Sequence, residues 1–91
     1  MAHTFEELVE MQRAADAAHA TVQRLQIEYG RPTQAEWADE QTAAWQAAWR
    51  AWLDTAVTLQ AAITGHAKEQ GVARNQVEAD VKKAARHPDE E

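Results

Sequence analysis

The feature that most constrains this fold is a helix-breaking segment between two long apolar repeats. Before the break, apolar side chains recur three and four positions apart, which is the spacing of a heptad stripe on one helix face. The stripe consists of Leu8, Met11, Ala15, Ala18, Val22, Leu25 and Tyr29. Gly30 and Pro32 follow, and both favour a helix end, because glycine suits a C-terminal cap and proline cannot continue a helix. The sequence therefore predicts a first helix over residues 5–29.

Both long helices are predicted to begin at a capping box. Thr4 precedes Glu7 by three positions, and Thr33 precedes Glu36 in the same way, so hydroxyl and carboxylate can each accept a backbone N–H bond at the helix start. The second helix is predicted over 34–64, or as far as residue 70 if Gly65 does not end it. Since only about three residues then connect the two helices, we expect an antiparallel hairpin.

Three tryptophans lie within residues 45–52 of the second predicted helix. At 100° per residue, Trp45, Trp52 and Ile63 fall within about 40° of one another, so they share one helix face. We interpret this face as core. A membrane-surface helix is disfavoured, because such a helix carries basic residues on its polar side and this one is mainly acidic there. The short connection places residues 43–48 opposite His19.

A third, shorter helix is predicted over residues 76–87. Asn75 can cap it, and Val77 and Val81 line one side. The second helix is longer than the first and overhangs its start, so the third helix can fold back on the overhang. Residues 88–91 are expected to form a flexible acidic tail. With 91 residues and few β-formers, the chain is predicted to be a single all-α domain.

Bulky apolar side chains also lie outside the seam of a two-helix hairpin. The apolar arc of the second helix spans roughly 160°, which is wider than one partner helix covers. Because large apolar patches seldom remain in water, we predict a homodimer in which two hairpins form a four-helix bundle. The predicted interface consists of Trp45, Trp49, Trp52, Leu53, Val57, Val9 and Ile27.

Residues that could carry catalysis or hold a metal ion are sparse. The chain has no cysteine and no serine. Asp16 and His19 have the three-residue spacing of ligand pairs in helical metal sites, but such sites need carboxylates from a facing helix, and residues 43–48 contain none. We therefore predict a non-enzymatic protein with no catalytic residue, no cofactor and no metal site.

The charge pattern leaves two functional hypotheses. The net charge of −6 disfavours general nucleic-acid binding, which needs a basic face. The leading hypothesis is a cytoplasmic protein–protein interaction module or homodimeric adaptor, with an unidentified protein partner and no membrane association. The alternative is a small DNA-associated regulator that uses either the acidic surface as a DNA mimic or the bases of the third helix. These bases are Arg74, Lys82, Lys83 and Arg86.

Overall fold

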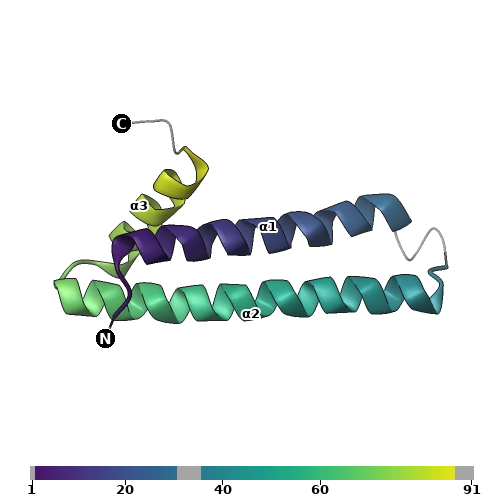
Figure 1. Cartoon of the computed structure of the whole chain (residues 1–91), viewed down its shortest axis with the longest axis horizontal. Coiled ribbons are helices and arrows are strands. Elements are labelled where there is room, and N and C mark those ends of the chain that lie inside the picture. Colours follow the sequence, from purple (N-terminus) through teal and green to yellow (C-terminus); the bar gives the residue numbers. More distant parts are fainter. Residues whose placement is uncertain (1, 31–35, 88–91) are drawn as a thin grey trace.

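The computed structural model describes residues 2–30 and 36–87, which form three α-helices and no strand. Helix α1 spans Phe5–Tyr29, α2 spans Asp39–Gln70 and α3 spans Arg74–Arg86. The two long helices run antiparallel as a hairpin, and α3 stands beside the end of the hairpin that is farther from the turn (Figure 1). The molecule is elongated, with extents of 50 × 28 × 18 Å. The all-α prediction is confirmed.

Helix α1 has the predicted bounds because its two ends are chemically specified. The Glu7 N–H donates to the Thr4 hydroxyl over 3.1 Å, and the Thr4 N–H donates to the Glu7 carboxylate over 3.0 Å. Two backbone donors that a helix start leaves unpaired are thereby satisfied. At the other end Gly30 adopts a φ of 75°, a value that costs little only for glycine.

Helix α2 begins later than predicted. Residue 34 was the expected start, but Glu36, Trp37 and Ala38 are not helical, and Thr33 of the expected capping box lies outside the described residues. The Gln41 side chain instead accepts a hydrogen bond from the Ala38 N–H over 2.9 Å.

The far end of α2 follows the longer of the two predicted alternatives. The helix continues through Gly65 to Gln70 and ends at Gly71, which has a left-handed φ of 67°. Flanking helical residues with good propensity keep Gly65 helical, at a cost of about 1 kcal/mol relative to alanine.

The late start of α2 shifts the pairing of the two long helices. Residues 43–48 were expected opposite His19, but the ring of His19 stacks on Trp52, with centroids 4.2 Å apart. Each residue added to the connection moves the facing residue of α2 further along the helix. The expected pairing was wrong because the connection was taken to be too short.

Helix α3 begins at Arg74, two residues before the expected start, and ends at Arg86, one residue before the expected end. Ala73 is its N-terminal cap residue and supplies no side-chain hydrogen bond, so Asn75 does not cap the helix as predicted. The expected acidic tail at 88–91 lies outside the described residues.

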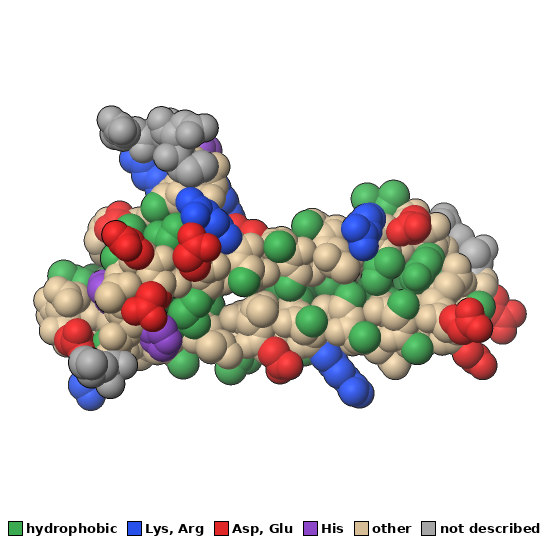
Figure 2. Space-filling model, in the orientation of Figure 1, with side chains coloured by type: hydrophobic (Ala, Val, Ile, Leu, Met, Phe, Trp, Pro, Cys, Tyr) green, Lys and Arg blue, Asp and Glu red, His purple; other side chains and the backbone are tan. Residues whose placement is uncertain are grey.

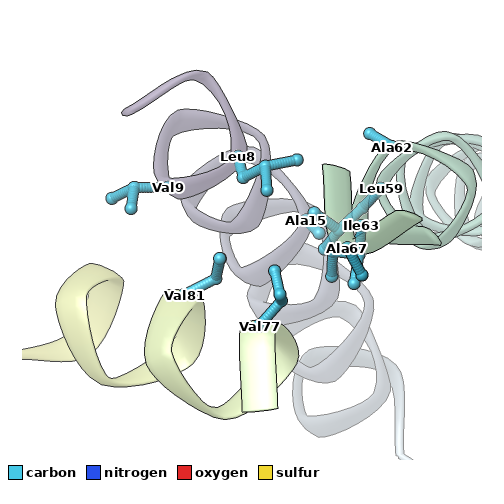
Figure 3. Close-up of a cluster of buried hydrophobic side chains, with 9 residues drawn as sticks. All are labelled: Leu8, Val9, Ala15, Leu59, Ala62, Ile63, Ala67, Val77 and Val81. Carbon is cyan, nitrogen blue, oxygen red and sulfur yellow. The ribbon is translucent and has the colours of Figure 1, made fainter. Parts of the chain in front are cut away.

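The apolar core lies where α3 meets the hairpin. Leu8, Ile63 and Val81 come from the three different helices and are completely buried (Figure 3). Burying a side chain of this size stabilises a fold by about 1.5–3 kcal/mol relative to leaving it exposed. Within the described residues, no helix is both long enough and apolar enough to span a bilayer.

Candidate interaction face

The half of the hairpin near the turn is built differently from the half that carries α3. Its side chains form a continuous row of aromatic rings, each within 6 Å of the next between centroids. The successive pairs are Tyr29–Trp37 at 5.5 Å, Trp37–Trp45 at 5.9 Å, Trp45–Trp49 at 5.4 Å, Trp49–Trp52 at 5.0 Å and Trp52–His19 at 4.2 Å. Stacked and edge-to-face pairs of this kind each contribute about 0.5–1.5 kcal/mol beyond the area they bury. We call this set of rings the aromatic row.

One hydrogen bond anchors the aromatic row at the turn. The Trp37 indole N–H donates to the Gly30 carbonyl over 3.1 Å and so links the end of α1 to the segment that precedes α2. Further along, the Trp45 indole nitrogen is buried without a hydrogen-bond partner among the described residues. Since an unpaired buried donor costs about 1–3 kcal/mol, ring contacts rather than polar bonds hold this inner part of the row.

The aromatic row leaves the turn half of the hairpin partly exposed to solvent. All its rings are only partly buried, and three aliphatic side chains of the two long helices are exposed. The exposed fraction is 84% for Ile27, 68% for Val57 and 44% for Leu53. In the α3 half nine apolar residues form one buried cluster, although Phe5 and Val72 of that half are exposed.

The exposed aliphatic residue of α1 lies on the side of the hairpin that carries α3. Val9 is buried in the core cluster that α3 completes. Ile27 follows Val9 by 18 positions, which is five full turns at 3.6 residues per turn. Ile27 therefore points in the same direction as Val9, but beyond the reach of α3.

The same periodicity places the exposed residues of α2 on this side. Thr64 faces α3, because its hydroxyl accepts a hydrogen bond from the Arg74 guanidinium over 3.0 Å. Val57 and Leu53 precede Thr64 by seven and eleven positions, close to two and three helical turns. The side that α3 covers in one half of the hairpin is thus left apolar and uncovered in the other. We call its residues the open face, and they are Ile27, Trp49, Leu53 and Val57.

The structure divides the predicted interface into three groups. Ile27, Leu53 and Val57 are exposed on the open face, and Trp49, a partly buried member of the aromatic row, lies at its edge. Trp45 and Trp52 are half-buried members of the aromatic row. Val9 does not belong to an exposed surface, because its exposure is 8% beneath α3. The prediction for Val9 was wrong because the third helix covers the flank of α1 that was assigned to a second copy.

The bases of α3 are mostly engaged within the chain. Glu78 forms ion pairs with Arg74 at 3.1 Å and with Lys82 at 2.9 Å. Arg86 donates two hydrogen bonds to the Asp16 carboxylate, at 3.0 and 3.2 Å. Lys83 forms no ion pair with any described residue. Three of the four bases predicted to contact nucleic acid are therefore already paired with acids.

These ion pairs shift the titration of the acids. Hydrogen bonding from Arg86 lowers the pKa of Asp16, and a further bond from Gln12 acts in the same direction. Hydrogen bonding from Lys82 likewise lowers the pKa of Glu78. The contact between Arg86 and Asp16 ties the end of α3 to the middle of α1.

The candidate metal pair does not assemble a site. Asp16 is bound by Arg86, and His19 is stacked on Trp52 rather than directed at the same point. In residues 2–30 and 36–87, no three His, Asp or Glu side chains converge so that they could hold a metal ion.

A small hollow separates the two halves of the hairpin. It has a volume of about 230 Å³ and is lined by Met11, Ala14, Asp54, Thr55 and Thr58. An opening between α1 and α2 is visible near the middle of the hairpin in Figure 2. Small side chains cannot fill the space between two helices there. The hollow lies along the hairpin between the core cluster and the aromatic row.

Comparison with known proteins found no similar protein. No protein family model matches the chain, and neither a curated protein nor a solved structure shows significant similarity to it. The open face must therefore be interpreted from its own chemistry.

Proposed function

We propose that this protein is a non-enzymatic helical interaction module that works as a homodimer, in which the open faces of two hairpins pack together into a four-helix bundle. The observation that carries the proposal is the change along one side of the hairpin. In one half this side is buried by α3, and in the other half the same side presents exposed Ile27 and Leu53, with exposed Val57 at the boundary between the two halves. Exposed apolar patches on otherwise polar proteins commonly mark interaction sites.

The chemistry of the open face suits a helical partner. It continues the side on which α3 already packs through Val77 and Val81, so a second helix layer can lie there in the same manner. Trp49 adds a large, rigid surface at the edge of the face, and tryptophan is enriched among residues that dominate interface energies. A second copy supplies a matching apolar surface in a two-fold arrangement, in which the same patch serves both subunits.

The dimer can be tested by sedimentation equilibrium over a range of protein concentrations. We expect the wild type to dimerise, and Leu53→Asp and Val57→Asp each to raise the dissociation constant by about 100-fold, because each buries a carboxylate without a partner. Ala44→Asp is the matched control. Ala44 is exposed and lies nine and thirteen positions before Leu53 and Val57, about 180° and 140° away around the helix, so this change should leave the dimer intact. A wild type that stays monomeric at every concentration would contradict the proposal.

The proposal also includes a non-enzymatic role and a location in the cytoplasm. A non-enzymatic role is supported by the engagement of Asp16 and His19 with other side chains. Location in the cytoplasm, expected from the sequence, is part of the proposal and can be tested by fractionation of native cells. Nucleic-acid binding is not proposed, because Arg74 and Arg86 are paired with acids of this chain and the net charge of −6 disfavours contact with phosphates.

A further inference from the structure

Helix α3 and the segment around the turn carry opposite net charge. The segment around the turn, residues 28–40, contains one base, Arg31, against the four acids Glu28, Glu36, Asp39 and Glu40. Helix α3 contains four bases against Glu78 and Asp80. Acidic side chains gather at the turn end of the hairpin and basic side chains on α3 in Figure 2. The open face lies between these two charged segments.

The position of α3 limits how a second hairpin can approach the open face. α3 stands on the same side of the hairpin as this face, so two copies packed in parallel would bring α3 against α3 and turn against turn. Both contacts place like charges together. The contact of α3 with α3 is also blocked sterically, because it would hold the two open faces apart. In an antiparallel arrangement, α3 of each copy lies beyond the turn of the other.

Lengths along α1 agree with the antiparallel arrangement. Arg86 at the end of α3 binds Asp16, so the uncovered part of α1 runs from there to Tyr29, about 20 Å at 1.5 Å per residue. A second hairpin that uses the same 20 Å in the opposite direction brings its turn level with Asp16. Its acidic turn then meets the basic end of α3.

From this geometry we infer that the two copies pair antiparallel, with the acidic turn of each held by the basic end of α3 of the other. Glu36 and Asp39 of one copy face Lys82 and Lys83 of its partner. Lys83 has no ion pair among the described residues, and the Lys82 side chain is 42% exposed although Glu78 binds it, so both ammonium groups can reach a second acid. The inference rests on the proposed homodimer and adds its orientation and a second contact surface.

Two charge-reversal variants test the orientation through their own homodimers, because parallel copies would already place like charges together and would not be weakened by either reversal. One carries Glu36→Lys with Asp39→Lys, and the other carries Lys82→Glu with Lys83→Glu. Each alone places like charges at both contacts, so its homodimer should dissociate about tenfold more readily at low salt. A mixture of the two variants restores opposite charges at both contacts. Native mass spectrometry should then show the heterodimer in clear excess over both homodimers, and added salt should remove this excess.

The controls separate this inference from the homodimer itself. Lys68→Glu reverses a base at the far end of α2 and should leave dimerisation near the wild-type level, and far-UV circular dichroism establishes that every variant is helical. If both reversal variants dimerise like the wild type, or if the mixture gives only the statistical share of heterodimer, the antiparallel orientation is wrong although the homodimer stands. If the wild type itself is monomeric, the proposed homodimer fails and the orientation fails with it.

Discussion

The two halves of this hairpin use the same helices but stabilise them by different means. In the α3 half, three helices enclose aliphatic side chains, and Leu8, Ile63 and Val81 are completely buried. In the turn half, two helices share large aromatic rings that touch one another and remain partly exposed, and Val22 is the one large aliphatic side chain buried there among the described residues. Two helices have only one seam, so a third element is needed to enclose bulky residues on both flanks. The α3 half therefore encloses most of its large apolar side chains, whereas the turn half leaves part of its apolar surface exposed.

The largest expected effect is in the α3 half. Ile63→Ala should lower the free energy of unfolding by about 3 kcal/mol, because it removes apolar contacts and leaves a cavity in an enclosed site. Urea denaturation followed by circular dichroism measures this loss. A loss below about 1 kcal/mol would show that the core cluster is not the main source of stability.

A smaller effect is expected from a larger side chain in the turn half. Trp52→Ala should lower the free energy of unfolding by about 2 kcal/mol, less than the 3–5 kcal/mol typical of a buried tryptophan, because its ring is partly exposed. Trp52→Phe keeps a ring to stack on His19 and should recover most of the loss. If Trp52→Ala cost more than Ile63→Ala under the same conditions, the contrast between the two halves would be broken.

The cap of α1 should contribute less again. Thr4→Ala removes the hydroxyl that accepts the Glu7 N–H, and it should lower the free energy of unfolding by about 1 kcal/mol. Thr4→Ser retains the hydroxyl and should behave like the wild type in thermal denaturation. An equal loss in both variants would mean that the methyl group of Thr4, not its cap, matters.

The smallest effect should come from the tie between α3 and α1, and it should depend on pH. Arg86 lowers the pKa of Asp16 from its ordinary value of 3.8, so the unfolded chain binds a proton at a higher pH than the folded one. The contribution of this carboxylate is thus fully present above about pH 5 and is lost as pH falls through the folded pKa. Asp16→Asn should cost about 0.5 kcal/mol at pH 7, as for a partly exposed pair.

Urea denaturation of the wild type and Asp16→Asn, repeated from pH 7 down to pH 2, checks this prediction. The difference between the two proteins should shrink at the acidic end. A difference that stays constant over the whole range would mean that the ionised carboxylate is not what ties α3 to α1.

Local chemistry explains which parts of the fold could be predicted. The bounds of α1 followed from the capping box at Thr4 and the glycine at position 30, since both act within a few residues. The start of α2 was wrong because the same capping signal occurs at Thr33, although Glu36, Trp37 and Ala38 are not helical. In this segment the Trp37 indole N–H donates a hydrogen bond to the Gly30 carbonyl, and no local sequence pattern predicts that contact.

Predictions of the candidate site depended on contacts between distant residues and were less complete. Ile27, Leu53 and Val57 were identified because their positions fall outside the main stripes, and they are exposed. Val9 met the same criterion but is buried, because α3 lies over it. The stack of His19 on Trp52 was missed, since the pairing of α1 with α2 depends on the length of the connection. An aromatic residue four positions beyond the expected facing segment was the only signal that could have suggested it.

By itself the sequence determined that this chain is helical, where α1 begins and ends, and which residues form the apolar stripes, because propensity, capping and periodicity act over a few residues. The tertiary structure alone decided how the two long helices pair and which flank α3 covers. Those outcomes depend on the length of a connection and on side chains up to 70 positions apart, such as Asp16 and Arg86. Only their meeting in space separates the buried Val9 from the exposed Ile27, two residues that helical periodicity places in the same direction.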